Sequence, residues 1–487
     1  MTIRTRFAPS PTGYLHVGGL RTLLNNYYFA RQNHGDLLLR IEDTDRERLV
    51  PGAIEALVKT LELLGIDYDE GPVIADGVLK EKGDHGPYTQ SSRLPLYREH
   101  AEKLLASGHA YRCFCSKERL DEVRKQGELA KQPAKYDRCC LKLSTEEVAT
   151  RVASGDAHVI RLKVPEGETT FTDIIHGKIT VPNADVDDQV LMKSDGFPTY
   201  HLAAVVDDHL MEISHVLRAE EWLPSTPKHL MLYAAFGWTA PSFAHLPQVL
   251  NADRTKLSKR QGDVAVEDYL KKGYLPEALE NFLSLIGYNP TGDREIYSRE
   301  EMVKLFDLSK VNKAGGFFDV TKLNWMNEQY LRKLSVEELM ESVKPFLAVA
   351  NREVPAEMLK KICAVEQGRL TTLKEMVERV EGYLAMPAYD PSILVWKKAD
   401  VADAKRNLEI IIAFLEAESA SLFDTIALLE ARILGYIKEK ELKNGNVLWP
   451  MRVALSGRSA SPSPFELAWV LGKDETLRRL AAATKFF

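Results

Sequence analysis

The chain has 487 residues, of which 45% are hydrophobic and 28% charged, and its formal net charge is −6. Because a single core rarely grows past roughly 250–300 residues, we expect several domains. The composition is typical of a globular protein and excludes a mainly disordered chain. The negative net charge excludes wholesale coating of nucleic acid but permits a local basic face.

The cellular setting is indicated by three features. The chain contains no apolar run near the roughly 20 residues that a membrane helix needs, so we expect no membrane association. Arg4 and Arg6 follow closely on Met1, so we expect no secretory signal. Five cysteines, four of them close together, fit metal binding or free thiols better than disulfides. We therefore expect a cytoplasmic protein.

The first stretch combines a strand, a loop of small residues and a helix. Ile3–Ala8 predicts a strand that is broken at Pro9 and Pro11, and a helical pattern starts at Leu20. Between them lies His16-Val17-Gly18-Gly19, where backbone N–H groups and the helix dipole can meet a phosphate. Neither common glycine-rich phosphate motif is present, so a simple tight turn remains the alternative.

The residues that follow predict an α/β fold. Leu37–Ile41 indicates a buried strand that ends at Glu42, and a helix is expected from 53 to 64. Alternating elements with nearly continuous apolar strands favour a parallel sheet covered on both faces. Ligands bind at the carboxyl ends of such strands, which places Glu42 near the first loop. A solvated turn is the alternative.

A cysteine cluster follows a predicted helix at 94–105. Cys113 and Cys115 lie one residue apart, and Cys139 and Cys140 lie about a hairpin's length further on. Four such donors can close a tetrahedral zinc site. The alternative is a set of incidental thiols beneath a loop.

The middle of the chain predicts the second half of the sheet. Strands are expected from His158 to about Val181, then at Pro198–Leu202 and Val205–Asp208, and again at His245–Leu250. The simplest account is a second βαβ half that is separated from the first by an inserted domain.

A basic segment follows these strands. Lys256, Lys259 and Arg260 surround Ser258 on a predicted loop. These cations are suited to clamp a polyphosphate and to neutralise the charge of a leaving pyrophosphate. A solvated basic surface is the alternative.

The last third of the chain predicts helices only. Ser335 and Glu338 form a capping box that opens a new helix, so we place a boundary at Leu334. Further helices are expected near 356–366, 371–385, 402–417 and 422–439, in a block that looks like a binding module. The expected domains are a Rossmann-like catalytic domain at 1–110 and 191–250, an inserted α+β domain at 111–190, a helical domain at 251–334 and an all-α domain at 335–487.

Several of these segments together resemble a known family. PSPTGYLHVGG and KLSKR are similar to the HIGH and KMSK signatures of class I aminoacyl-tRNA synthetases. FAPSPTG, RIEDTD, GPYTQSSRLPLY, YHLAAVVDDHLM and RAEEWLPSTPKH resemble the bacterial glutamyl-tRNA synthetases, and the resemblance runs along the whole chain.

The resemblance implies roles for individual residues. It assigns catalysis to His16, Lys256 and Lys259. ATP, with Mg²⁺, would be bound by Ser10, His16, Gly18, Gly19, Ser258 and Lys259. L-glutamate would be bound by Arg6, Ala8, Ser10, Glu42, Tyr200 and Arg218.

The implied reaction has two steps. Glutamate attacks ATP to give glutamyl-adenylate and pyrophosphate, and the terminal ribose of tRNA(Glu) then attacks the activated carbonyl. Bound tRNA is expected to be required for activation. The inserted domain would hold the acceptor end, and the C-terminal helices would read the anticodon, with Arg369 as a candidate contact. We expect a monomer, and whether tRNA(Gln) is also charged is left open.

Two positions depart from the family. Ala204 stands where many members have Asn, and Lys142 stands where zinc-binding members often have a fourth ligand. By analogy with related synthetase-like proteins, Tyr136 could complete a zinc site with Cys113, Cys115 and Cys140. Four rival interpretations are weighed. They are a glutaminyl-tRNA synthetase, which would end in β-barrels, a truncated tRNA-modifying relative, a catalytically silent tRNA-binding protein, and a nucleotidyltransferase with a similar His-Gly loop that does not act on RNA.

Overall fold

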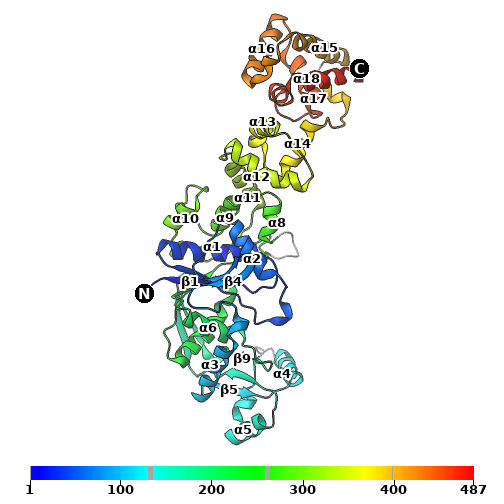
Figure 1. The fold of residues 1–487 in the computed structure, drawn as a ribbon. Coiled ribbons are helices and arrows are strands. Elements are labelled where there is room, and N and C mark those ends of the chain that lie inside the picture. The colour runs from blue at the N-terminus through cyan, green and yellow to red at the C-terminus, as the bar shows by residue number, and fades with distance from the viewer. Residues whose placement is uncertain (1, 130–134, 258–263, 398) are drawn as a thin grey trace. The chain divides into compact units, whose positions relative to one another are not determined.

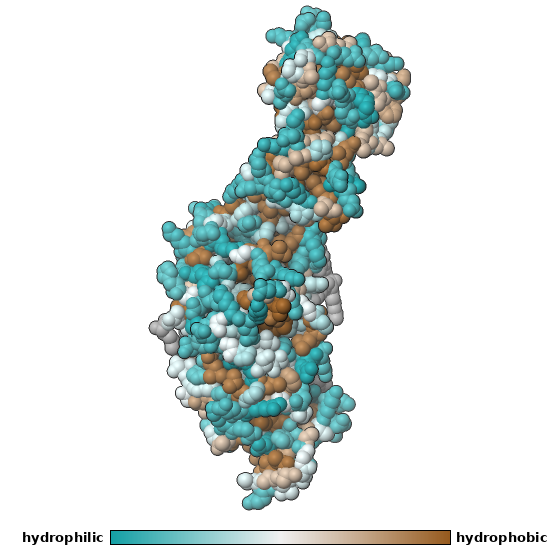
Figure 2. Space-filling view, viewed as in Figure 1, coloured by the Kyte–Doolittle hydropathy of each residue, from teal (hydrophilic) through white to brown (hydrophobic). Residues whose placement is uncertain are grey.

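The computed structural model of the chain describes every residue except 1, 130–134, 258–263 and 398. These residues form two compact units. The first comprises residues 1–269 and 279–320, and the second comprises 270–278 and 321–487. Among the described helices, none is both long and apolar enough to cross a membrane. Hydrophilic residues cover most of the face seen in Figure 2, and hydrophobic ones are scattered in small groups.

The strands lie in the first unit. They are β1 (Arg4–Phe7), β2 (Asp36–Leu39), β3 (Gly71–Ala75), β4 (Val78–Lys82), β5 (Ala110–Cys113), β6 (Val159–Leu162), β7 (Glu168–Asp173), β8 (Gly177–Pro182), β9 (Val190–Met192), β10 (His215–Ala219), β11 (Ser242–Leu246), β12 (Val249–Leu250) and β13 (Gly316–Phe317).

Parallel pairing at the centre confirms the predicted α/β fold. β1 pairs in parallel with β2, with Phe7 opposite Leu39. β10 pairs in parallel with β11, with Arg218 opposite His245. The backbone N–H of Ser214, just before β10, donates to the carbonyl of Arg4 at 3.0 Å, so the two pairs adjoin. Nearly every residue of these strands is buried, as expected of a sheet with both faces covered.

The segment predicted as an insertion contributes a hairpin to this sheet. β7 and β8 pair antiparallel, and β7 continues the sheet in the order β10-β11-β7-β8. The contact between β11 and β7 is a single parallel register pair, Phe243 opposite Asp173. A separate three-stranded antiparallel sheet has the order β5-β6-β9.

Eleven described α-helices occur up to residue 331. Figure 1 labels most of them. They are α1 (Val17–Gln32), α2 (Ala53–Leu63), α3 (Leu94–Ala106), α4 (Lys117–Leu129), α5 (Thr145–Ala153), α6 (Tyr200–Leu210), α7 (Thr226–Phe236), α8 (Val266–Lys271), α9 (Pro276–Ser284), α10 (Arg299–Leu305) and α11 (Val320–Leu331).

One sequence prediction was wrong. Pro198–Leu202 and Val205–Asp208 were expected to be strands, but residues from Tyr200 to Leu210 form the helix α6. Eight consecutive residues of this helix, from His201 to Asp208, are buried. A helix that is buried on all sides has no polar stripe, so its apolar run is indistinguishable from that of a central strand.

The second unit is helical throughout its described part. Its remaining helices are α12 (Val336–Val349), α13 (Ala356–Glu366), α14 (Met376–Leu384), α15 (Val401–Ala417), α16 (Ile426–Glu439), α17 (Asn444–Ser456) and α18 (Pro464–Ala483). Ser335 caps α12 through the predicted capping box with Glu338. Leucine, isoleucine and valine side chains of these helices share one buried core. The all-α C-terminal block is therefore confirmed.

Candidate active site

A cavity of about 390 Å³ opens where β1 and β10 end. Its size is within the range of small-molecule sites. It is bordered by the loop between β1 and α1, by the first residue of α6 and by the segment after β10. Eight of the residues predicted to contact substrates line it: Arg6, Ala8, Ser10, His16, Gly19, Glu42, Tyr200 and Arg218.

Two arginines and two carboxylates form a buried network on one side of this cavity. Arg6 Nε donates to Asp208 Oδ1 at 3.0 Å, and Arg40 Nη1 donates to the same oxygen at 2.7 Å. Arg40 Nη2 donates to Glu42 Oε1 at 3.0 Å. The carboxylate of Asp208 thus holds Arg6 beside the cavity, and Arg40, which does not itself line the cavity, holds Glu42 there.

The charge of Glu42 is set by opposing effects. Burial raises the pKa of its carboxyl group, and the charges of Arg40 and Arg6 act against this rise. A cationic group of a ligand beside Glu42 would favour the ionised form still further. Glu42 is therefore suited to receive an ammonium group.

Arg218 stands in a different environment from Arg6. Its Nη1 donates to Tyr200 Oη at 2.9 Å and to His229 Nδ1 at 3.2 Å. Its Nη2 donates to Thr226 Oγ1 at 3.0 Å and to the carbonyl of Trp222 at 3.2 Å. Within the described part of the chain, no carboxylate lies within 4.0 Å of it. Its positive charge is therefore available to an anionic ligand.

The HVGG segment forms the start of α1. His16 is the N-cap residue, and its Nδ1 accepts from the backbone N–H of Gly18 at 2.9 Å. Because Nδ1 is an acceptor, the neutral ring carries its proton on Nε2. This arrangement combines a hydrogen-bond donor with the positive end of a helix dipole, which together suit a phosphate.

A second cavity of about 330 Å³ adjoins this helix start. His16, Gly18, Gly19 and Lys256 line it, so the HVGG loop and the first lysine of KLSKR share one space. The Lys256 ammonium pairs with the carboxylate of Glu221. The predicted phosphate contacts Ser258 and Lys259 lie outside the described residues.

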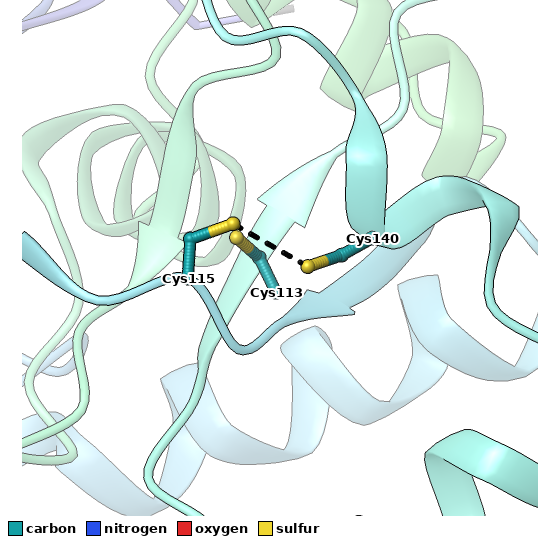
Figure 3. Close-up of side chains that lie close together, drawn as sticks. All are labelled: Cys113, Cys115 and Cys140. Carbon is teal, nitrogen blue, oxygen red and sulfur yellow. Dashed lines mark hydrogen bonds between the residues drawn. The ribbon is translucent and has the colours of Figure 1, made fainter. Parts of the chain in front are cut away.

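Three thiols converge at the end of β5, as Figure 3 shows. The Sγ atoms of Cys113, Cys115 and Cys140 all lie within 4.8 Å of one another. Tyr136 Oη lies 3.3 Å from Cys113 Sγ and 3.4 Å from Cys115 Sγ. Cys139 Sγ lies 3.4 Å from Cys115 Sγ but is not part of the three-thiol group. The four residues predicted as zinc ligands are thus brought together.

Sequence reasoning missed several residues that shape the cavity. Asp208 was predicted only as the end of a strand and as part of a motif, although an acid that follows a buried apolar run indicates a buried ionic role. Trp222 lines the cavity and its ring lies 4.2 Å from that of Tyr200, centroid to centroid. Ala204 is fully buried one turn after Tyr200 and does not line the cavity.

Arg369 lies in the second unit, far along the chain from this site. Its guanidinium donates to the carbonyl of Val365 and, at 3.3 Å, to Glu466 Oε2. Its side chain is 38% exposed, so part of it is accessible to a ligand.

A parallel sheet whose first strand leads through an HVGG loop into a capped helix, with a lysine segment on the same cavity, defines the class I type of tRNA synthetase. The chain matches the family model described as tRNA synthetases class I (E and Q), catalytic domain, over residues 2–325. It matches the model of an anticodon binding domain over residues 338–484. The chain belongs to the class I tRNA synthetases of the E and Q group.

Similar proteins agree with this assignment. The chain is 46% identical to a glutamate–tRNA ligase of Alkaliphilus metalliredigens, with 98% of each chain covered. It is 45% identical to a glutamate–tRNA ligase of Clostridium botulinum (strain Hall), covering 98% of this chain and 97% of the other. The crystal structure of a glutamate tRNA ligase from Elizabethkingia meningosepticum in complex with its amino acid is similar, with a TM-score of 0.90, 36% identity and coverage of 100% and 99%.

Proposed function

We propose that the protein ligates L-glutamate to tRNA(Glu) with ATP, in two steps through glutamyl-adenylate. One observation carries the choice of amino acid: the cavity is lined by two guanidiniums, of Arg6 and Arg218, and by the carboxylate of Glu42. A substrate with two carboxylates and one ammonium matches that set. Arginine suits the bidentate geometry of a carboxylate better than lysine does.

Arg218 favours glutamate over glutamine. Its guanidinium has no carboxylate partner among the described residues, so a carboxylate ligand gains the full charge interaction. An amide would bring N–H donors toward a group that can only donate. Rejection of glutamine then follows from unpaired donors and uncompensated charge.

The protein acts in both steps by positioning and by electrostatics. In the first, an oxygen of the glutamate α-carboxylate attacks the α-phosphorus of ATP, and pyrophosphate leaves. In the second, a hydroxyl of the terminal ribose of tRNA attacks the carbonyl, and AMP leaves. Neither step needs a covalent enzyme intermediate. Orientation of two bound reactants in one cavity supplies much of the rate.

ATP is proposed to bind along the start of α1, together with Mg²⁺, which supplies positive charge to its phosphates. His16 would donate from Nε2, while Gly18 and Gly19 let the nucleotide approach the main chain, and Ser10 borders the same space. Lys256 would reach the phosphates after parting from Glu221. We assign Ser258 and Lys259 to the phosphates as well, from the resemblance of KLSKR to the KMSK signature.

We also propose that Cys113, Cys115, Tyr136 and Cys140 bind zinc. In tetrahedral zinc sites with Zn–S bonds of about 2.3 Å, neighbouring sulfurs are about 3.8 Å apart. Cys115 Sγ and Cys140 Sγ are 3.5 Å apart, and Tyr136 Oη is as close to two of the thiols, so the donor set fits such an ion. Zinc would tie η3, the short helix Cys139–Lys142, to β5.

The tRNA is proposed to engage several parts of the chain. Residues 111–190 would hold the acceptor end, 251–334 would contact the stem, and 335–487, including Arg369, would read unstacked anticodon bases. The catalytic domain would comprise 1–110 and 191–250. The protein is proposed to act as a cytoplasmic monomer.

The test is charging of purified tRNA(Glu) and tRNA(Gln) side by side with radiolabelled glutamate and, separately, glutamine. We expect glutamate to be attached to tRNA(Glu), and glutamine to neither tRNA. Attachment of glutamine alone would overturn the amino-acid assignment. Attachment of glutamate to both tRNAs would instead establish the broader specificity that the sequence leaves open.

A further inference from the structure

A buried chain of hydrogen bonds leads from Arg218 away from the cavity. Arg218 Nε donates to His245 Nε2 at 3.0 Å, and His245 Nδ1 lies 2.7 Å from Asp173 Oδ2. The side chains of His245 and Asp173 are both fully buried. Neither residue lines the substrate cavity. Any effect of this pair on a bound substrate must therefore pass through Arg218.

The hydrogen bonds determine the tautomer of His245. A guanidinium can only donate, so Nε2 of His245 has to accept. A neutral imidazole then carries its proton on Nδ1, which donates to Asp173. Burial lowers the pKa of His245, which keeps the ring neutral near pH 7. One tautomer is thus consistent with both partners.

The remaining donors of Arg218 show what this contact orients. Its two Nη groups bond to Tyr200 Oη and the carbonyl of Trp222, from residues that line the cavity, and to His229 Nδ1 and Thr226 Oγ1, from residues that do not. Nε bonds to His245, which also does not line the cavity. Because the guanidinium is planar, fixing Nε also fixes the plane in which the two Nη groups lie beside the cavity.

We propose that Asp173 and His245 are positioning residues for glutamate binding: Asp173 holds His245 in its Nδ1–H tautomer, and His245 holds the guanidinium of Arg218 in register with the substrate carboxylate. This inference rests on the proposed glutamate binding at Arg218. It assigns a role in the amino-acid site to Asp173, which belongs to the β7–β8 hairpin of residues 111–190.

The contacts of Asp173 make a sharp variant available. Its Oδ1 accepts from the backbone N–H groups of Ile175 and His176 at 3.0 and 2.9 Å. Its Oδ2 accepts from the backbone N–H of His245 at 3.2 Å as well as from Nδ1. In Asp173→Asn, we expect the amide oxygen to stay with the two donors at Oδ1 and the NH₂ group to replace Oδ2. Its NH₂ group then faces His245 Nδ1, which must become an acceptor. The proton moves to Nε2 and opposes the N–H of Arg218.

Two readouts are expected to change in Asp173→Asn. The glutamate KM should rise about tenfold to a hundredfold, the range for a hydrogen bond to a charged group, with little change in the ATP KM or in kcat. In protein labelled with ¹⁵N-histidine, the His245 signals should change from Nδ1-protonated to Nε2-protonated. Because the His245 signals disappear in His245→Gln, this variant assigns them. The amide oxygen of the glutamine can still accept from Arg218 Nε, so His245→Gln should bind glutamate more tightly than His245→Ala.

Asp188→Asn is the matched control. Asp188 is a buried carboxylate of the same inserted segment that bonds to Tyr111 and Arg138, not to the Arg218 network. Asp188→Asn should lower the thermal stability of the protein and leave its glutamate KM unchanged. The positioning role is overturned if Asp173→Asn leaves either the glutamate KM or the His245 tautomer unaltered. It is also overturned if Asp188→Asn raises the glutamate KM as much as Asp173→Asn does. Absence of glutamate activation by the wild type would instead remove the proposed function, with the tautomer unaffected.

Discussion

The Glu42 carboxylate combines burial with two neighbouring guanidiniums, and this balance governs how it can act. Burial raises the pKa of Glu42, so it takes up a proton at a higher pH than an ordinary glutamate. Only the ionised form attracts an ammonium. Binding of the amino acid should therefore weaken as the pH falls toward that raised pKa.

Glu42→Gln removes the charge but keeps the size. We expect the glutamate KM at pH 7.5 to rise about tenfold to a hundredfold, because a hydrogen bond between charged groups is lost. We also expect kcat/KM for glutamate to lose its decline on the acidic side, since Gln does not titrate. ATP–pyrophosphate exchange over a range of pH measures both effects.

Asp43→Asn is the control for this variant. Asp43 is the next residue and accepts from the backbone N–H of Ser91, but it does not line the cavity. Its glutamate KM should stay near that of the wild type. If Glu42→Gln behaves like Asp43→Asn, the ammonium is bound elsewhere.

At the scale of whole elements, α18 depends on one buried arginine. Arg479 donates to the carbonyls of Leu455 and Tyr383, which belong to α17 and α14. Its Nε donates to Glu475 Oε1 at 2.7 Å. Glu475 also pairs with the exposed Arg478 at 2.6 Å. The carboxylate therefore neutralises a guanidinium that fastens three helices together.

Glu475→Gln should destabilise this packing by about 1 kcal/mol at pH 7, a value reduced because water reaches the carboxylate. Contacts with Arg478 and Arg479 lower the pKa of Glu475 to about 2. A lowered folded-state pKa contributes stability above the unfolded value of about 4.3, and that contribution is lost as the pH falls toward 2. Hydrogen exchange of α18 should show a larger difference in stability between the wild type and Glu475→Gln at pH 7 than at pH 3.

Arg478→Ala tests whether the contact of Glu475 with the buried Arg479 stabilises α18 more than its contact with the exposed Arg478. Arg478 is 62% exposed, so its loss should change exchange of α18 only slightly. An effect as large as that of Glu475→Gln would mean that the surface pair, rather than Arg479, accounts for the stability.

The cysteine cluster joins two segments that are short of other buried apolar contacts. Its core comprises Cys113, Tyr136 and Cys140 with a few half-buried neighbours. Such a small core gains stability from a bound ion, because ligands far apart in the chain become linked.

Metal analysis of the purified protein should find about one zinc per chain. Cys113→Ser should abolish it and lower the melting temperature, whereas Cys363→Ser should retain it, since Cys363 is buried in the helical core of the second unit. Tyr136→Phe should weaken zinc binding if its oxygen is the fourth ligand. If Tyr136→Phe keeps its full zinc content and Cys139→Ser loses zinc, the fourth ligand is Cys139.

At the scale of the whole molecule, the two family matches fall on different parts of the chain. The substrate cavity lies in the first unit, and the anticodon-binding match covers residues 338–484 of the second. A tRNA that is read by its anticodon and charged at its terminal ribose has to contact both units.

ATP–pyrophosphate exchange is therefore expected to require tRNA(Glu) as well as glutamate. Exchange should persist when the terminal ribose of the tRNA lacks both hydroxyls, because the first step does not use them, while aminoacylation should stop. A tRNA for another amino acid should support neither reaction. Full exchange with glutamate and ATP alone would contradict this coupling.

Much of the architecture followed from sequence patterns. Leu37–Leu39 has only apolar residues because both faces of its strand are covered, and Ser335 with Glu338 marked the start of α12 through a local capping interaction. The same reasoning failed at α6. Its buried faces left no periodicity that separates a helix from a strand.

Some residues of the candidate site were predictable from the sequence, and others were not. Arg6, Glu42 and Arg218 were predicted from motifs, and the fold brings them to one cavity. Asp208 and His245 were not predicted as site residues, since their roles depend on partners more than 25 positions away.

The sequence by itself determined the elements whose causes are local: turns, caps, buried strands and the residue types that the substrate chemistry needs. Only the tertiary structure decided which charges face one another. Asp208 meets Arg6 and Arg40, and Asp173 meets Arg218 through His245, because strand pairing and helix packing close those distances. Electrostatic interaction depends on separation in space and on burial, and neither is encoded in the spacing of residues along the chain.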